Sequence, residues 1–281
     1  MNKKTIVAFI YDFDHTLCTT DMQNYSFIPS LNIKPAEFWQ LANELTVKEH
    51  MDSLLAYMYL MITESKKNNL PITRDAFVKL GEAIKLFPGV DTWFERINKY
   101  GEERGVEVHH YVISSGNSEI IEGSSIYRFF KKVFACEYLY DDKGEAIWPK
   151  AVINYTTKTQ FIYRINKGVL DLAENDKVNA SVPDEQKPVP FHNMIYIADG
   201  LTDVPCMKLV KSNGGTAIAV YDKNKKPAKK LFADGRVDFL CEADYSENTT
   251  IDEIAKLLID KIAPMDKLYK LHVSQMYDES K

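Results

Sequence analysis

Apolar residues along the chain fall into several short, unbroken runs, and each run predicts a buried strand. Residues 6–11 (IVAFIY) are apolar or aromatic without alternation, which is typical of a parallel-sheet strand covered on both faces. Helical patterns separate most of the runs, so the sequence predicts an α/β protein with a doubly wound, Rossmann-like parallel sheet. Further strands are expected at 106–113, 133–140, around Trp148, at 194–198, at 216–221 and, as an edge strand, at 237–240.

The chain between residues 18 and 86 has a helical pattern instead. Pro35 suits the first turn of a helix, and apolar residues then recur at helical spacing in the segments 38–45 and 54–62. Thr73 is a candidate N-cap for a third helix. We therefore predict a helical cap domain, residues 18–86, inserted after the first strand of a catalytic core that comprises residues 1–17 and 87–281.

Helices and loops are expected between the remaining strands. The segment 168–192 contains three prolines and predicts a surface loop, and the lysine-rich stretch 223–230 predicts a solvated loop. Helices are expected from an N-cap at Asp91 to about Arg104, after Asn117 through Phe130, at 158–167, from Val204 to near Asn213, and after a capping box at 250–253 (TIDE).

Composition narrows the class of protein. The chain carries a formal charge of −5, and 45% hydrophobic and 27% charged residues are ordinary values for a soluble globular protein. A negative balance gives no reason to expect a nucleic-acid partner. No apolar run approaches the ~20 residues that cross a bilayer, so no membrane partner is expected. The four cysteines are far apart, which argues against a disulfide framework or a zinc site and favours a cytoplasmic protein. The sequence leaves the oligomeric state open.

Polar residues directly follow three of the predicted strands. In a doubly wound sheet, ligands bind beyond the carboxyl ends of the strands, so these residues are expected to gather at one edge. Neighbouring carboxylates repel each other unless a cation lies between them, and the arrangement therefore favours a divalent metal site. The residues are Asp12 and Asp14 after the first strand, Ser114 and Ser115 after the strand at 106–113, and Asp199 and Asp203 after the strand at 194–198.

Asp12 and Asp14 form the central pair of this group. Residues two apart along an extended segment point to the same side, so the two carboxylates are expected to share one side of the chain. Taken alone, the pair is also compatible with two solvated turn acids, with Thr16 satisfying backbone groups. The other polar strand ends favour the metal site.

The same residues lie in segments that resemble the four motifs of the haloacid dehalogenase-like superfamily of phosphotransferases. DFDHT at 12–16 resembles the first motif, VISSG at 112–116 the second, Lys158 at the start of a predicted helix the third, and ADGLTD at 198–203 the fourth. The predicted cap between the first two motifs is similar to that of the phosphoserine phosphatase-like branch. This resemblance implies a Mg²⁺-dependent phosphatase that hydrolyses a small phosphorylated metabolite through an aspartyl-phosphate intermediate.

The resemblance also implies a role for each residue. Asp12 would attack phosphorus as a nucleophile, and Asp14 would act as general acid and base. The further catalytic residues would be Ser114, donating a hydrogen bond to a phosphoryl oxygen, and Lys158, stabilising the charge of the transition state. The implied phosphate-binding residues are Phe13, Ser115, Gly116 and Lys158. The implied Mg²⁺ ligands are Asp12, Asp14 (through its backbone carbonyl), Asp199 and Asp203, the last of which could instead orient Lys158.

The chain departs from the family pattern in the predicted cap. Phosphoserine phosphatases read the amino-acid part of their substrate with a cap glutamate and arginine, whereas here Asp21 stands at the position of the acid and the cap's only arginine is Arg74. Phosphoserine is therefore not the expected substrate. Tyrosine and tryptophan in the cap could hold a cation such as phosphocholine, and His15 could contact the substrate. Ala198, where glycine is common, should change little.

Other functions are compatible with the same residues. A phosphotransferase or mutase would pass the phosphoryl group to an acceptor other than water. A carbon–halogen hydrolase would use the same nucleophile, but it needs no acid at Asp14. A non-catalytic phosphoacceptor or binding module also gathers aspartates, a hydroxyl and a lysine around Mg²⁺, although it needs neither the cap nor Asp14.

Overall fold

The computed structural model describes residues 4–279, which are built around a seven-stranded sheet with the order β4-β3-β2-β1-β5-β6-β7. All neighbouring strands are parallel except β3 and β4. The chain order reverses at β1, which lies between β2 and β5, so the sheet is doubly wound as predicted. The strands are β1 (Thr5–Tyr11), β2 (Val106–Asn117), β3 (Phe130–Tyr140), β4 (Ala146–Ala151), β5 (Met194–Ala198), β6 (Thr216–Tyr221) and β7 (Phe239–Glu242).

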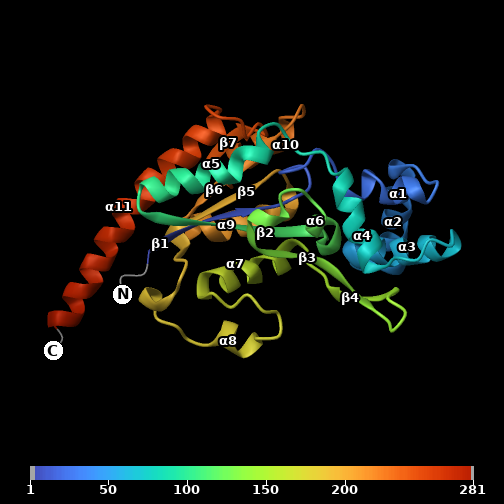
Figure 1. The fold of residues 1–281 in the computed structure, drawn as a ribbon, viewed down its shortest axis with the longest axis horizontal. Coiled ribbons are helices and arrows are strands. Elements are labelled where there is room, and N and C mark those ends of the chain that lie inside the picture. The colour runs from blue at the N-terminus through green and yellow to red at the C-terminus, as the bar shows by residue number, and fades with distance from the viewer. Residues whose placement is uncertain (1–3, 280–281) are drawn as a thin grey trace.

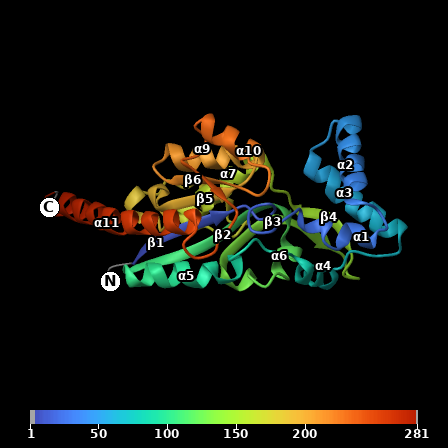
Figure 2. The ribbon, with the colours of Figure 1, turned by 90° about the horizontal axis from the view of Figure 1, so that it is seen from above.

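Helices cover both faces of the sheet. Figure 2 shows α7, α9 and α10 on one side of the strands and α5 and α6 on the other. The long helix α11 packs against β1, β7 and α5 (Figure 1). The right-handed crossover of parallel strands explains this division, because the chain runs outward from β1 in both directions. The helices are α5 (Val90–Glu103), α6 (Ser118–Glu122), α7 (Lys158–Lys167), α8 (Asn175–Asn179), α9 (Val204–Ser212), α10 (Lys226–Ala233) and α11 (Thr250–Glu279).

The segment between β1 and α5 forms a separate group of helices at one end of the molecule, beside β4 (Figure 1 and Figure 2). Its entry and exit run side by side, because Thr19 N donates to Lys85 O at 3.0 Å and Phe87 N donates to Leu17 O at 3.0 Å. This pairing favours the predicted insertion, and the bounds 18–86 for the cap stay a prediction. The helices are α1 (Phe27–Ser30), α2 (Pro35–Glu49), α3 (Ser53–Lys67) and α4 (Arg74–Leu80).

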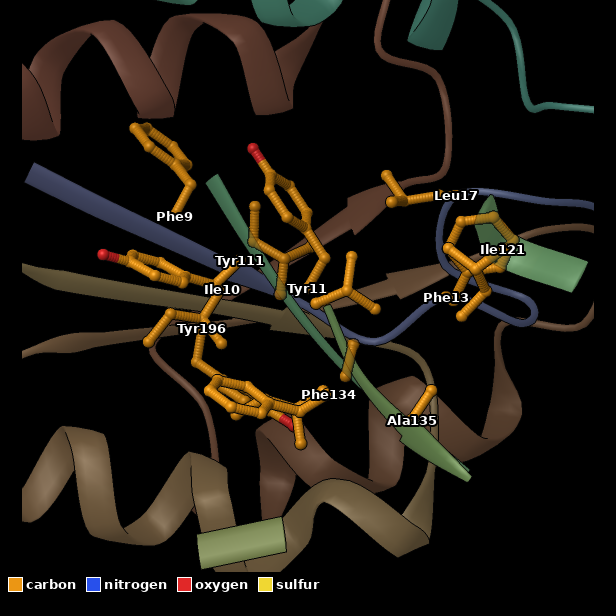
Figure 3. Close-up of a cluster of buried hydrophobic side chains, with 14 of the residues drawn as sticks. Phe9, Ile10, Tyr11, Phe13, Leu17, Tyr111, Ile121, Phe134, Ala135 and Tyr196 are labelled. Carbon is orange, nitrogen blue, oxygen red and sulfur yellow. The ribbon is translucent and has the colours of Figure 1, made fainter. Parts of the chain in front are cut away.

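The core lies on both faces of β1. Residues 6–11 are at most 8% exposed, which confirms the strand buried on both faces. Figure 3 shows Phe9 and Tyr11 on one face of β1, and Ile10 with Tyr196 of β5 on the other. On the first face, Phe9 and Tyr11 make ring contacts with Trp93 and Phe94 of α5. Packing on both faces therefore fixes the end of β1, and Asp12 follows directly after it.

A buried chain of hydrogen bonds runs through the same face. Trp93 Nε1 donates to the Tyr11 hydroxyl at 2.9 Å, and that hydroxyl lies 3.0 Å from His110 Nδ1. The other ring nitrogen, His110 Nε2, lies 3.0 Å from Asn98 Oδ1. Burial lowers the pKa of His110 to about 3, so the ring is neutral in the folded protein.

Several predicted elements are confirmed at their bounds and others are wrong. The strands at 194–198 and 216–221 and the helix at 158–167 are confirmed. The helix predicted through Phe130 is wrong, because α6 ends at Glu122 and a Cβ on Gly123 would lie 1.7 Å from Val78 O. The loop predicted at 223–230 is also wrong, since α10 begins there with a proline in its first turn and buries Ala228 and Leu231.

Two predicted helix starts shift, by two residues in α5 and by one in α11. Helix α5 has Gly89 rather than Asp91 at its N-cap, and α11 begins at Thr250 itself rather than after it. Among residues 4–279, no helix combines the length and apolarity that a membrane span requires.

Candidate active site

Asp12 lies where β1 leaves the sheet. Its backbone N–H donates to Ile197 O of β5 at 3.0 Å, which fixes the first residue beyond the strand. Its Oδ1 accepts from Phe13 N at 2.8 Å and lies 3.2 Å from Lys158 Nζ. Its Oδ2 has no hydrogen-bond partner within residues 4–279. One carboxylate oxygen is thus held by the protein, and the other is free to react.

Lys158, at the start of α7, is fully buried between two carboxylates. Its Nζ donates to Asp203 Oδ1 at 2.7 Å, in addition to its contact with Asp12. Burial alone would lower the pKa of Lys158, but the charges of Asp12 and Asp203 raise it above its ordinary value. The ammonium group is therefore a fixed positive charge beside the free oxygen of Asp12.

Asp203 is held by hydroxyl groups as well. The Tyr196 hydroxyl donates to Asp203 Oδ1 at 2.5 Å, and Thr202 Oγ1 donates to Oδ2 at 2.9 Å. Both oxygens are engaged, so the hydrogen bonds favour the alternative in which Asp203 orients Lys158. Its predicted role as a metal ligand stays a prediction.

Three carboxylates meet at this edge of the sheet. Asp12, Asp199 and Asp203 each offer an oxygen, and these three oxygens lie within 4.8 Å of one another. Burial and then the charge of Asp203 raise the pKa of Asp12, and the same causes raise the pKa of Asp199 to about 6. Crowded, buried carboxylates are stabilised in their charged form by a divalent cation, and hard oxygen donors suit Mg²⁺. The donor set therefore fits the implied metal.

The hydrogen-bond contacts of the Asp14 side chain within residues 4–279 all involve one carboxylate oxygen, Oδ1. Its Oδ1 accepts from Met22 N at 2.9 Å and lies 3.5 Å from Cys18 Sγ. Its Oδ2 would lie 2.9 Å from a Cβ placed on Gly116, at the end of β2. Burial, followed by the charge of Asp21, raises the pKa of Asp14 to about 7. A carboxyl group with this pKa can both give and take a proton near neutral pH.

The end of β2 carries the predicted phosphate-binding residues, of which Gly116 lies beside Asp14. Ser114 is buried, and its Oγ accepts from Gly116 N at 3.0 Å, so its own hydroxyl proton remains available to a ligand. The Ser115 hydroxyl donates to Ile153 O at 2.9 Å, and the predicted phosphate contact of Ser115 stays a prediction. The side chain of Phe13 is buried in the core (Figure 3). Its N–H bonds to Asp12, and its predicted phosphate contact stays a prediction.

His15 lies beside the carboxylates. Its Nε2 is 3.6 Å from Asp21 Oδ1, and its backbone has a positive φ of 56°. The contact with Asp21 raises the pKa of His15 to about 9 despite partial burial. His15 thus adds a positive charge near the site, and its contact with a substrate stays a prediction.

Sequence reasoning missed three residues that hold the site together: Tyr196, Cys18 and Met22. Tyr196 occurs within a buried strand, and a buried tyrosine hydroxyl needs a partner, so its position was a usable signal. Cys18 and Met22 left no such signal, because they contact Asp14 through a thiol and a backbone N–H in a segment without periodicity.

Comparisons with known proteins agree with this geometry. A family model of haloacid dehalogenase-like hydrolases matches residues 9–208. An uncharacterized protein of Borreliella burgdorferi is 30% identical to this chain over an alignment that covers 89% of this chain and 95% of that protein. A HAD family hydrolase from Salmonella enterica superposes with a TM-score of 0.57 at 14% identity, covering 92% of this chain and 73% of that chain.

A phosphoserine phosphatase structure described as a phospho-aspartyl intermediate analogue superposes with a TM-score of 0.53 at 15% identity, covering 91% of this chain and 99% of that chain. Identities this low show a shared fold alone. The family match, in contrast, spans all four motif segments and most of the chain. The chain therefore belongs to the haloacid dehalogenase-like hydrolase family, and its fold is that of the phosphoserine phosphatase-like branch.

Proposed function

We propose that this protein is a Mg²⁺-dependent phosphatase that hydrolyses a small phosphomonoester through an aspartyl-phosphate intermediate. The observation that carries the proposal is the state of Asp12. One of its oxygens is fixed by Lys158 and Phe13, the other accepts no hydrogen bond within residues 4–279, and the carboxylate lies beside that of Asp199. A buried, oriented carboxylate with one free oxygen and an adjacent fixed ammonium group suits nucleophilic attack on phosphorus.

In the proposed reaction, Asp12 and Asp14 make the bond to phosphorus and transfer the protons. Asp12 Oδ2 forms a bond to phosphorus, and the bond from phosphorus to the leaving oxygen breaks with its electron pair on that oxygen. Asp14 donates a proton to the leaving oxygen, then takes one from a water molecule that attacks the phosphorus. The second attack releases phosphate and restores the Asp12 carboxylate. Lys158 offsets the negative charge that builds up in both steps.

Mg²⁺ would be held by the carboxylates of Asp12 and Asp199 and by the backbone carbonyl of Asp14. When bound, the ion reduces the charge repulsion between an anionic nucleophile and an anionic phosphate. Asp203 is assigned a positioning role here, because its oxygens already accept from Lys158, Tyr196 and Thr202.

The substrate is proposed to be a small phosphorylated metabolite other than phosphoserine. Arg74, the arginine of the predicted cap, forms an ion pair with Glu122 of α6. Asp21, at the position of the family's acid, contacts His15. Neither side chain is thus left to bind the charged groups of an amino acid. A cytoplasmic location and the absence of a nucleic-acid partner stay predictions.

The test is hydrolysis of p-nitrophenyl phosphate by the full chain, with Mg²⁺ and with a chelator. We expect phosphate release that requires Mg²⁺ and is abolished by Asp12→Asn, which removes the nucleophilic oxygen. Asp142→Asn is the matched control, because Asp142 lies exposed in the turn between β3 and β4. Unaltered turnover in the Asp12 variant would remove the mechanism, and a long-lived phosphoenzyme without release would favour the phosphoacceptor alternative.

A further inference from the structure

The segment that leads from β1 toward α1 touches the candidate catalytic residues directly. Met22 N donates to Asp14 Oδ1 at 2.9 Å, and Met22 Sδ accepts from Asn117 N at 3.2 Å. The next residue, Gln23, donates from Nε2 to Asn117 Oδ1 at 2.8 Å. Met22 and Gln23 are 1% and 2% exposed, so both side chains are sealed between this segment and the end of β2.

The side chain of Met22 also fills the space above Gly116. A Cβ on Gly116 would lie 2.1 Å from Met22 Cε and 2.8 Å from Met22 Sδ. The same Cβ would lie 2.9 Å from Asp14 Oδ2. The methionine, the glycine and the carboxyl group therefore pack against one another without room for another side-chain atom.

The hydrogen bonds of Asp14 distinguish its two oxygens. Oδ1 accepts from Met22 N–H and has the thiol of Cys18 within 3.5 Å. A proton on Oδ1 would point at these donors, so the protonated carboxyl group carries its hydrogen on Oδ2. Oδ2 faces Gly116, at the end of β2, where the phosphate contacts are expected.

We propose that Met22 is a positioning residue of the reaction: packed against Gly116 and Asn117, it keeps its backbone N–H on Asp14 Oδ1 and so presents Oδ2 to the leaving oxygen. This inference rests on the proposed function. As the bond between phosphorus and the leaving oxygen breaks, the electron pair stays on that oxygen, which takes the proton from Asp14 Oδ2. Without the packing of Met22, the carboxyl group of Asp14 rotates more freely and protonates the leaving oxygen less efficiently.

This role makes a prediction that a purely structural role does not. A weakly basic leaving group, such as p-nitrophenolate, departs without a proton, whereas phenolate and methoxyphenolate need one. Met22→Ala should therefore lower kcat/KM for phenyl phosphate by about tenfold more than for p-nitrophenyl phosphate. Met22→Leu keeps the bulk and the backbone N–H, so it should retain most of the wild-type ratio between the two esters.

Met61→Ala is the matched control. Met61 is another fully buried methionine, which α3 carries, and its Sδ lies 3.6 Å from the hydroxyl of Tyr138 in β3. Any loss of activity from general loosening in this variant should affect both esters equally. Circular dichroism and urea unfolding of each variant verify that the chain is folded when it is assayed.

A double-mutant cycle with Asp14→Asn completes the test. In that background the proton donor is already absent, so Met22→Ala should change kcat/KM for phenyl phosphate by less than about twofold. An equal loss on both esters, or the same loss with and without Asp14, would overturn the positioning role. Failure of the wild-type chain to hydrolyse either ester with Mg²⁺ would instead overturn the proposed function on which the inference rests.

Discussion

Replacing Lys158 with methionine should separate the structural and chemical roles of the buried charges. The substitution keeps the length of the side chain and removes the ammonium group that contacts Asp12 at 3.2 Å and Asp203 at 2.7 Å. Breaking a buried charge cluster by removing one partner typically lowers the free energy of unfolding by about 3–5 kcal/mol. Asp203 keeps two hydroxyl donors, so we expect a value near the lower end, about 3 kcal/mol.

The loss of unfolding free energy caused by Lys158→Met should be larger at higher pH. Burial and Asp203 already raise the pKa of Asp12, and loss of Lys158 removes the charge that opposes this rise. The folded variant then binds more protons than its unfolded chain, so its stability falls as the pH rises. The difference from wild type should thus be larger at about pH 7.5 than at about pH 5.

Equilibrium urea unfolding at the two pH values, without Mg²⁺, measures this difference. Lys150→Met is the control, since Lys150 forms a half-exposed ion pair with Glu137 and its loss should change the free energy of unfolding by less than about 1 kcal/mol. If Lys158→Met is as stable as this control, or if its deficit grows toward acid pH, the buried charge cluster does not behave as described.

Three further outcomes follow from other parts of the structure. The pKa of His110 is about 3 in the folded protein and 6.5 for an ordinary histidine, so the unfolded chain binds the extra proton between these values. The contribution of His110 to the free energy of unfolding should therefore fall by about 2 kcal/mol between pH 7 and pH 5, and the difference in urea unfolding between the wild type and His110→Gln should change by this amount. Gly116→Ala should cost about 1–3 kcal/mol and most of the activity, because its Cβ would collide with Met22 and approach Asp14; unfolding and phosphate release measured together check this. Mg²⁺ should raise the Tm of the wild type. Asp199→Asn should raise the Mg²⁺ concentration that gives half of this Tm shift by about tenfold or more. An unchanged half-shift concentration would exclude Asp199 as a ligand.

The parts of the fold that were predictable depend on local patterns. The strand at 194–198 and the helix at 158–167 follow from uninterrupted apolar runs and helical spacing, which need no knowledge of distant residues. The end of α6 was missed although Gly123 at its C-cap is a local stop signal, and only the structure shows how closely this glycine packs against Val78. Helix α10 was not predicted, because its lysines suggest a solvated segment and only Ala228 and Leu231 are buried in it.

The candidate site also contains residues that the sequence predicts and residues that only the structure shows. Asp12 and Asp199 could be placed together from the rule that ligands bind at the carboxyl ends of strands, and the structure brings their oxygens within 4.8 Å. The position of Tyr196 in a buried strand signals that its hydroxyl needs a partner, but only the structure shows that this partner is Asp203. Met22 acts through its backbone and its packing, and neither has a signature in the sequence.

Identification of the phosphorylated residue tests the central claim most directly. The protein is mixed with p-nitrophenyl phosphate and Mg²⁺ and quenched in acid. Tritiated borohydride then reduces any aspartyl-phosphate to labelled homoserine, which peptide mapping locates. The account predicts label at Asp12 alone, and none when Asp12 is replaced by asparagine. Phosphate release with no label at Asp12, or with label at another carboxylate, would contradict it.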